Sequence, residues 1–131
     1  MEIDSLLVFC RVGPELRLGL SVPKVRRNYL ASRLTRPAAR AMLSYLRRTL
    51  PRKLEPALEA GMFDAVMAHW GVVTQPLADI IRRHGRELYV WTVDDHMRLP
   101  SLYRLGVTGV ITNDRLLFAR AGLDPARVSS A

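Results

Sequence analysis

Short hydrophobic runs alternate along this chain with segments whose hydrophobic residues recur at the spacing of an α-helix. The runs are continuous rather than alternately hydrophobic and polar, which is typical of strands covered on both faces in a parallel sheet. We therefore predict parallel strands over residues 16–22, 63–69, 87–93 and 109–112.

Helices are predicted between these strands. The first spans residues 37–50, with Pro37 in its first turn and Pro51 as the residue that ends it. Thr74 is placed to cap a later helix. The other helical segments are residues 55–61, 75–85, 97–106 and 113–122, the first three ending in a glycine suited to a C-cap, and residues 5–14 resemble the end of one more helix.

Short strands joined by single helices predict right-handed β-α-β units. About four such units fit into the 131 residues, which are enough for one domain or part of one. Four units make an open sheet or half of an eight-stranded barrel, not a closed barrel. The predicted fold class is therefore α/β with a parallel sheet.

The composition is that of a soluble globular chain, with 49% hydrophobic residues and no apolar run near the roughly 18 residues that a membrane span needs. Glu2 and Asp4 stand where a secretory signal would carry basic residues. The single cysteine, Cys10, cannot form an internal disulfide and lies in an apolar run typical of a buried thiol. We therefore expect a cytoplasmic location.

The net charge of +8 is unevenly distributed. Residues 24–53 contain no acidic residue, and this segment attracts phosphate groups or forms a solvated helix face. Only Tyr29 and Tyr45 are interleaved with its cations, which argues against stacking on single-stranded nucleic acid, and no specific nucleic-acid partner is expected. Its ten basic residues are Lys24, Arg26, Arg27, Arg33, Arg36, Arg40, Arg47, Arg48, Arg52 and Lys53.

Candidate binding residues lie where the predicted strands end, because ligands of parallel β/α folds bind at the carboxyl ends of the strands. Lys24 follows the first strand, His69 ends the second, and Trp91 lies near the end of the third. After the third strand, Asp94 and Asp95 bind a metal or, more commonly, cap the next helix, and after the fourth strand Asn113 and Asp114 cap the last helix.

Two segments of the sequence resemble the signature that closes the barrel of glycerophosphodiester phosphodiesterases. They are YVWTVDD at 89–95 and LGVTGVITNDR at 105–115, and they match the family pattern in order, spacing and predicted structure. GLSVP at 19–23 and the strand ending at His69 fit the fifth and sixth strands of that barrel, and Arg115 stands where the family usually has proline. The resemblance covers nearly the whole chain and implies that residues 1–131 form the C-terminal half of a (β/α)8 TIM barrel.

The resemblance implies a phosphoric diester hydrolase of lipid metabolism, which converts a glycerophosphodiester and water into an alcohol and glycerol 3-phosphate with a divalent metal, Mg or Ca. In this reading Trp91 forms a wall for the glycerol carbons, with an ordinary core indole as the alternative. His69 and Lys24 also contact the substrate, and their alternatives are a hydrogen-bonded structural histidine and a solvent-exposed cation.

The family's catalytic residues belong to the first strands of the barrel, whose signature begins with His-Arg-Gly followed by a Glu-x-Asp segment. None of the three histidines, His69, His84 and His96, precedes Arg-Gly. Glu-x-Asp occurs once, from Glu2 to Asp4, without the His-Arg-Gly that should come before it. Metal-assisted hydrolysis needs a carboxylate cluster and a positioned acid–base pair. We therefore expect no catalytic residue and no metal ligand in this chain, and little or no activity from it alone.

An open half-barrel exposes two strand edges and an apolar inner face. We therefore expect a homo-oligomer or an N-terminal half-barrel as the partner, besides a glycerophosphodiester-like small molecule in the complete barrel. The alternative function is a non-catalytic phosphate-binding or assembly module, or one subunit of a split enzyme.

Overall fold

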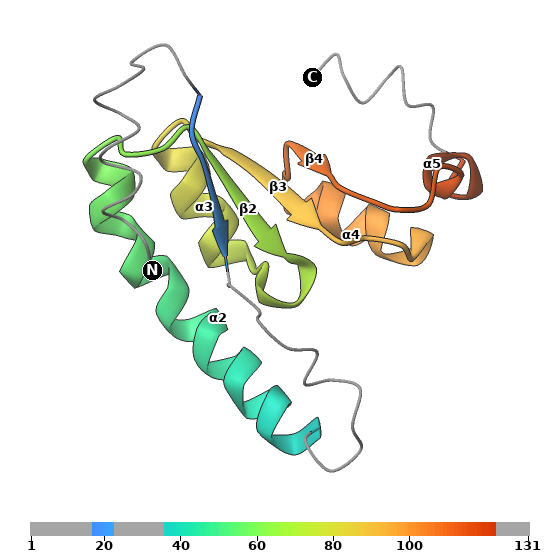
Figure 1. Cartoon of the computed structure of the whole chain (residues 1–131), viewed down its shortest axis with the longest axis horizontal. Coiled ribbons are helices and arrows are strands. Elements are labelled where there is room, and N and C mark those ends of the chain that lie inside the picture. The colour runs from blue at the N-terminus through green and yellow to red at the C-terminus, as the bar shows by residue number, and fades with distance from the viewer. Residues whose placement is uncertain (1–16, 23–35, 123–131) are drawn as a thin grey trace.

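The structure, a computed structural model, describes residues 17–22 and 36–122. Within them, the strands form one parallel sheet in which each strand pairs with the next along the chain. The strands are β1 (Gly19–Val22), β2 (Ala65–His69), β3 (Glu87–Trp91) and β4 (Gly109–Val110), as Figure 1 shows. The predicted strands and the α/β class are confirmed, although every strand is shorter than predicted.

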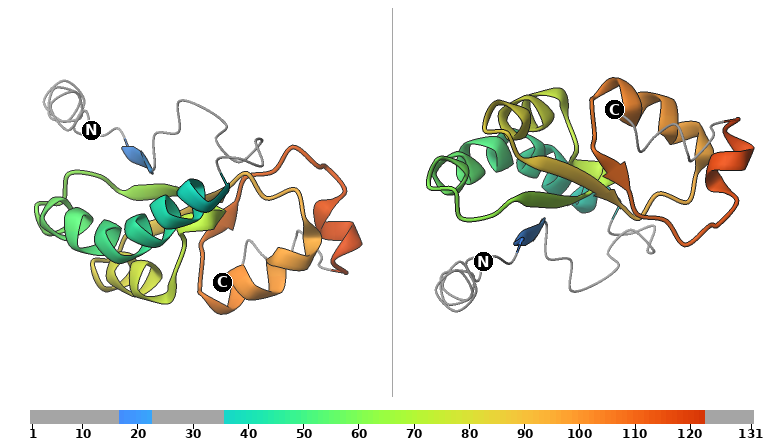
Figure 2. Two further views of the ribbon diagram at one scale, coloured as in Figure 1. Left: turned by 90° about the horizontal axis from the view of Figure 1, so that it is seen from below. Right: turned by 90° about the horizontal axis from the view of Figure 1, so that it is seen from above.

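Helices follow the strands as the sequence predicted, and Figure 2 shows α2, α3 and α4 on one side of the sheet. Gly61, Gly85 and Gly106 have positive φ at the helix ends, as predicted for C-caps. The helical elements are α2 (Arg36–Glu59), η2 (Trp70–Val72), α3 (Gln75–Arg83), η3 (His96–Arg98), α4 (Leu99–Arg104) and α5 (Leu117–Arg120).

The prediction that Pro51 ends the first helix is wrong, because α2 continues through Pro51 and Pro56. A proline inside a helix removes one backbone hydrogen bond and strains the preceding turn. Packing against the core offsets this cost, since Leu50, Leu54 and Leu58 recur at helical spacing and are all buried. The predicted separate segment at 55–61 is therefore the last part of α2.

The hydrophobic core lies between the sheet and its helices. Its largest fully buried side chains come from α2, α3, α5, η2 and the strands, with contributions from the segments that join them. They are Phe63, Leu54, Leu58, Leu77, Ile81, Leu117, Val66, Val72, Val90 and Val93. Among the described helices, none is long and apolar enough to cross a membrane.

The two faces of the sheet differ in burial. On β2 and β3 the residues that pack with the helices are buried, namely Val66, Ala68, Leu88 and Val90. The residues that alternate with them are only half-buried, namely Ala65, Met67, His69, Glu87, Tyr89 and Trp91. Only one face of these strands is thus fully covered, whereas the sequence predicted cover on both. A closed barrel would cover the second face with its remaining strands.

Some predictions concern residues that the structure does not describe. These include the helix end at 5–14, Cys10, Lys24 and the basic residues between 25 and 35. In the described part of α2, the basic residues Arg40, Arg47, Arg48, Arg52 and Lys53 are all exposed.

Candidate substrate-binding edge of the sheet

His69 and Trp91 lie side by side at the carboxyl ends of the parallel strands, which we call the carboxyl edge of the sheet. They are register partners at the ends of β2 and β3. Their ring centroids are 5.5 Å apart and the rings meet edge to face at 80°. Trp70 also lies against the imidazole, with a centroid distance of 5.1 Å and a tilt of 35° between the rings. The two tryptophans of the chain therefore both contact the same histidine.

The His69 ring is held in place by the backbone that follows it. The Gly71 N–H donates a hydrogen bond to His69 Nδ1 at 3.1 Å, and Arg47 Nε donates to the Gly71 carbonyl at 2.8 Å. An imidazole nitrogen that accepts a hydrogen bond carries no proton, so the neutral ring has its proton on Nε2. Helix α2 thus fixes the orientation and the tautomer of His69 through the first turn after β2.

The pKa of His69 is lowered from its ordinary value, first because the ring is partly buried and second because the positive charge of Arg98 lies nearby. Both causes disfavour the imidazolium ion. Near neutral pH His69 is therefore an uncharged ring with one donor, Nε2–H, and it is not a cation for a phosphate.

Arg98 brings a positive charge to this edge. Its guanidinium carbon lies 3.7 Å from the centroid of the Trp70 ring, a stacked cation–π contact. Arg98 Nε also lies 3.5 Å from the Asp95 carboxylate, and the Arg98 side chain remains 41% exposed. The guanidinium is therefore held in position while part of it stays accessible to an anion.

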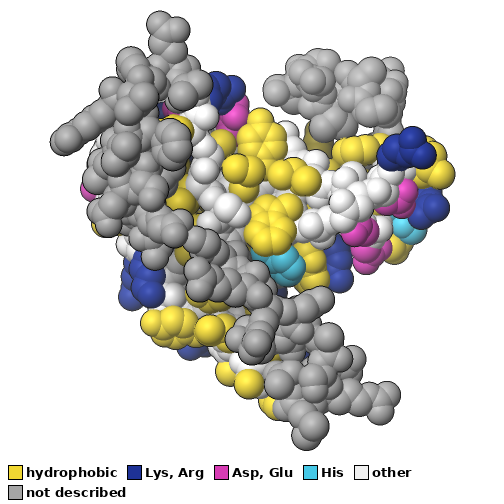
Figure 3. All heavy atoms as spheres, in the orientation of Figure 1, with side chains coloured by type: hydrophobic (Ala, Val, Ile, Leu, Met, Phe, Trp, Pro, Cys, Tyr) yellow, Lys and Arg dark blue, Asp and Glu magenta, His cyan; other side chains and the backbone are white. Residues whose placement is uncertain are grey.

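Trp91 is half-buried, and its indole Nε1 is buried without a hydrogen-bond partner among the described residues. The indole therefore offers apolar ring surface rather than a donor. Figure 3 looks onto the sheet face that no described helix covers, where hydrophobic side chains gather over β2 and β3 beside a histidine. This surface suits a wall for carbon atoms better than a site for charge.

Asp94 joins the two segments on which the family resemblance rests. Its Oδ1 accepts hydrogen bonds from the Thr112 hydroxyl at 3.0 Å and from the Asn113 N–H at 2.9 Å. The Thr112 oxygen in turn accepts from the Asp114 N–H at 2.9 Å. The loops after β3 and β4 are therefore connected directly through side chains.

The other acidic residues at this edge also stabilise backbone turns. Asp95 caps η3 by accepting from the Met97 N–H at 3.0 Å, which confirms the capping interpretation for this residue. The predicted cap of the last helix by Asn113 or Asp114 is wrong, because the N-cap of α5 is Leu116 and no side chain caps it. Asp114 accepts from the Leu116 N–H at 2.9 Å and pairs with Arg120 at 2.8 Å, in the turn before α5. These carboxylates serve separate turns, and within the described residues they do not form a group of three ligands close enough to share a metal ion with Asp94.

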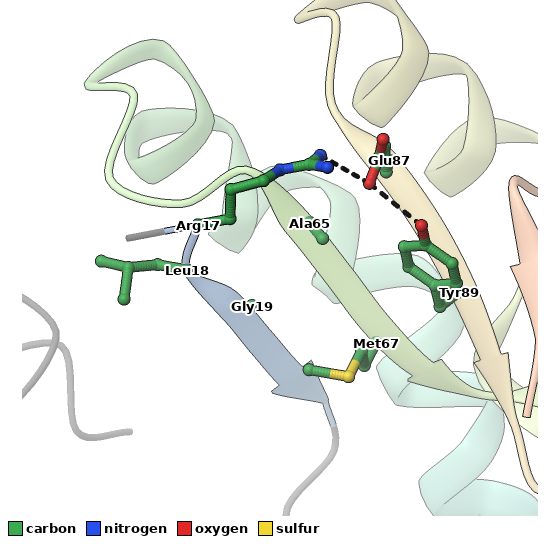
Figure 4. A pocket seen from close by; sticks show the side chains of 7 residues that line it. All are labelled: Arg17, Leu18, Gly19, Ala65, Met67, Glu87 and Tyr89. Carbon is green, nitrogen blue, oxygen red and sulfur yellow. Dashed lines mark hydrogen bonds and ion pairs between the residues drawn. The ribbon is translucent and has the colours of Figure 1, made fainter. Parts of the chain in front are cut away.

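A hollow of about 230 Å³ lies at the opposite end of the same sheet face. Figure 4 shows Arg17, Glu87 and Tyr89 around it, with Glu87 Oε2 accepting from Arg17 at 2.8 Å and from the Tyr89 hydroxyl at 3.1 Å. The hydrogen bond from Arg17 is the main cause of a lowered Glu87 pKa. This hollow lies where the strands begin, so it is separate from the edge that carries His69 and Trp91.

Two of the three predicted substrate-binding residues are brought together, since His69 and Trp91 are neighbours. Lys24 lies outside the described residues. Sequence reasoning missed the contributions of Trp70, Arg98 and Arg47. Trp70 was detectable as the residue after His69, whereas the two arginines carried no signal beyond their charge.

A parallel sheet with alternating helices, and with aromatic, histidine and arginine side chains at the carboxyl ends of its strands, is the layout of part of a β/α barrel. The model of the glycerophosphoryl diester phosphodiesterase family matches residues 24–116 of this chain. That match covers most of the 131 residues, and the chain belongs to this family.

Individual relatives agree with this assignment. The Arabidopsis thaliana protein "Glycerophosphodiester phosphodiesterase GDPD4" is 36% identical over 47 residues, which are 36% of this chain and 14% of that protein. A crystal structure assigned as a glycerophosphoryl diester phosphodiesterase from Silicibacter pomeroyi DSS-3 superposes with a TM-score of 0.60 at 16% identity. The superposition covers 94% of this chain but only 37% of the Silicibacter pomeroyi chain. The superposition confirms the predicted partial TIM-barrel fold.

Proposed function

We propose that this chain supplies the C-terminal, substrate-binding part of a glycerophosphodiester phosphodiesterase barrel. The complete barrel would cleave the P–O bond between phosphate and alcohol with water, and release the alcohol and glycerol 3-phosphate. The observation that carries the proposal is the arrangement of His69, Trp70, Trp91 and Arg98 at the carboxyl edge of the sheet. Family membership supports the reaction type.

Each residue of this edge has a proposed part in binding. The half-buried Trp91 ring contacts the glycerol carbons, and the Nε2–H of neutral His69 donates a hydrogen bond to a substrate oxygen. Arg98, stacked on Trp70, attracts the phosphate. Lys24, which comes two residues after the end of β1 in the sequence, is proposed as a second cation.

The metal of the family is proposed to bind to residues outside the described carboxyl edge. The carboxylates of Asp94, Asp95 and Asp114 already accept hydrogen bonds from separate turns. The catalytic histidines and metal ligands of the complete barrel would come from its other strands. The chain alone is therefore proposed to bind without hydrolysing, and to act in the cytoplasm, which its single cysteine favours.

The half-exposed sheet face and the edges of β1 and β4 support a proposal that residues 1–131 act within a larger assembly. An N-terminal half-barrel or a second copy of this chain would cover the hydrophobic surface over β2 and β3. Light scattering of the purified chain tests this. A mass above that of the monomer is expected, and a strictly monomeric chain would count against it.

Tryptophan fluorescence tests the binding proposal directly, because Trp70 and Trp91 are the only tryptophans. Glycerol 3-phosphate should change the emission in a saturable way, whereas glycerol alone should not. A Trp70→Phe chain reports from Trp91 alone. In that background Arg98→Gln should weaken binding at least about tenfold, while Arg48→Gln on the exposed face of α2 should leave it unchanged. An equally weak fluorescence response to glycerol 3-phosphate in the Trp70→Phe chain and in both of its arginine variants would contradict this site.

Hydrolysis is tested separately with glycerophosphocholine and Mg²⁺ or Ca²⁺. The chain alone should release no choline above the background rate. Release that disappears on Trp91→Ala or His69→Ala would show that the chain is a complete catalyst, and it would refute the binding-only proposal.

A non-catalytic phosphate-binding or assembly module is the second candidate, favoured by the missing His-Arg-Gly signature. It predicts binding of glycerol 3-phosphate as well. The two candidates differ when an N-terminal half-barrel of the same family is added, because only the first predicts that hydrolysis appears.

A further inference from the structure

We propose a second, structural metal site on the helix side of the fold, formed by Glu55, Glu59 and His84. The ligand atoms of these three side chains all lie within 4.8 Å of one another. They come from two elements, since the two glutamates lie on the last turns of α2 and His84 is the C-cap residue of α3. The ligand class is a divalent transition-metal ion such as Zn²⁺.

The position separates this site from the substrate-binding edge. Helices α2 and α3 end where β2 and β3 are about to begin, so Glu59 and His84 lie near the amino ends of those strands. His69, Trp91 and Arg98 lie at the opposite, carboxyl ends. Residues at the amino-terminal end of β/α barrels contribute to stability rather than to chemistry. A metal there would therefore hold helices together and would not act on the substrate.

The charges at this position favour a cation. Glu55 and Glu59 are four residues apart on one helix, where like charges repel each other. They also lie at the C-terminal end of α2, whose dipole is negative, and no basic residue lies in its last turn. The C-terminus of α3 at His84 adds a second negative helix end, which Arg82 and Arg83 in its last turn partly offset. Two carboxylates in this position destabilise the helix unless a positive charge binds between them.

No side-chain cation within the described residues takes that role, even though the chain carries 20 Lys and Arg. Arg86, which follows His84 closely, pairs instead with Asp64 at 3.2 Å. Arg82 pairs with Asp79 at 3.5 Å. Neither Glu55 nor Glu59 has an ion pair with a described residue, and this leaves both carboxylates available as ligands.

The donor set selects the kind of metal. Two carboxylate oxygens with one imidazole suit Zn²⁺ and its transition-metal neighbours, whereas Mg²⁺ and Ca²⁺ prefer oxygen ligands alone. Ligand atoms on one tetrahedral zinc ion lie roughly 3.3 Å apart. Glu55 and His84 are half-buried, while Glu59 is exposed. The ligand atoms, which lie within 4.8 Å of one another, must therefore approach by about 1–2 Å to share one ion, and water completes the coordination.

Calorimetric titration of the purified chain, in the assembly that it forms, tests the proposal with Zn²⁺ as the probe. We expect one Zn²⁺ per chain, and an excess of Mg²⁺ should not displace it. The chain used should carry Cys10→Ser, because a thiol is itself a zinc ligand. Thermal unfolding followed by circular dichroism should show a higher midpoint with Zn²⁺, since an ion that binds only the folded state stabilises it.

Isosteric and matched variants locate the site. Glu55→Gln, Glu59→Gln and His84→Ala should each weaken Zn²⁺ binding at least about tenfold, as even loss of an outer-shell partner does. The controls are His96→Ala at the opposite edge and Asp79→Asn on α3, and both should bind like the parent chain. The circular dichroism spectrum of each variant confirms that it is folded.

Two outcomes would overturn the proposal. One is the absence of Zn²⁺ binding at submillimolar concentration in the folded parent chain. The other is binding that survives in Glu55→Gln, Glu59→Gln and His84→Ala but is lost in His96→Ala or His69→Ala. The first outcome does not bear on the substrate-binding edge, whose own test uses glycerol 3-phosphate and tryptophan fluorescence. Loss of Zn²⁺ binding in His69→Ala would instead place the metal at that edge.

Discussion

Arg47 on α2 reaches across to the turn after β2, where its Nε donates a hydrogen bond of 2.8 Å to the Gly71 carbonyl. Gly71 in turn donates its N–H to His69 Nδ1 at 3.1 Å. A residue of the basic segment 24–53 therefore positions a residue of the candidate site. One member of this segment has a structural task, whereas its neighbour Arg48 is simply exposed.

Arg47→Met tests this connection. It removes the donor but keeps most of the aliphatic length, and the free energy of unfolding should fall by about 1 kcal/mol, the net worth of one partly exposed hydrogen bond. The NMR signals of the His69 ring should also broaden or shift, because its turn loses support. Arg48→Met is the matched control and should change neither quantity. Urea unfolding must be compared at one protein concentration, since assembly changes apparent stability.

The two segments that resemble the family could be recognised in the sequence, because each is a continuous run of residues. "YVWTVDD" and "LGVTGVITNDR" predicted two strands and the turns after them, and both are present. The hydrogen bonds that join the two segments could not be predicted from the sequence. The bond between Asp94 and Thr112 spans 18 residues and exists only because β3 and β4 pair side by side.

Asp94→Ala should loosen this link. It removes the acceptor for both the Thr112 hydroxyl and the Asn113 N–H, and the expected loss is about 1–2 kcal/mol, because the group is exposed and water replaces part of the interaction. Asp94→Asn keeps an acceptor oxygen without the charge, so its loss should be less than half as large. Urea unfolding of the two variants gives the comparison. An equal loss in both would show that charge, not hydrogen bonding, holds the loops together.

Burial and Arg98 together lower the pKa of His69, and this has a pH consequence. The unfolded chain takes up a proton on this residue near its ordinary value of about 6.5, while the folded chain resists protonation until a lower pH. The unfolded state therefore binds more protons between these two pKa values, so the stability contributed by His69 is complete above about pH 6.5 and falls as the pH drops through that window.

NMR titration of the His69 ring should give a midpoint below 6.5. His69→Gln should flatten part of the slope of stability against pH in the same window. Arg98→Gln should raise the His69 midpoint, although not to the ordinary value, because burial is the larger cause of the shift. A midpoint at or above 6.5 in the parent chain would contradict the assigned environment.

The sequence could not reveal how the sheet faces would be covered. Continuous hydrophobic runs predicted strands buried on both sides, yet Met67, Tyr89 and Trp91 are only half-buried. Side chains this hydrophobic suit the interior of a complete barrel. The pattern along the sequence does not reveal which residues pack against them from the other side. The same limit applies to Arg98, whose position over Trp70 depends on the path of the loop after β3.

At Pro51 the packing of the helix against the core outweighs the tendency of proline to end a helix. The sequence predicted that it ends the helix, but α2 continues to Glu59, because Leu54 and Leu58 beyond the proline are buried in the core. The helix therefore tolerates a residue that supplies no N–H to the Arg47 carbonyl one turn earlier.

Pro51→Ala should then stabilise the fold. Alanine restores the backbone hydrogen bond and removes a cost of about 3 kcal/mol in a helix interior, and the greater freedom of the unfolded chain returns about 1 kcal/mol of that gain. The expected net increase in the free energy of unfolding is about 1–2 kcal/mol. Pro37→Ala is the control, because a proline in the first helical turn gives up no internal hydrogen bond and its replacement should change little. Urea unfolding in which Pro51→Ala is less stable than the parent would mean that the proline shapes α2 to fit the sheet.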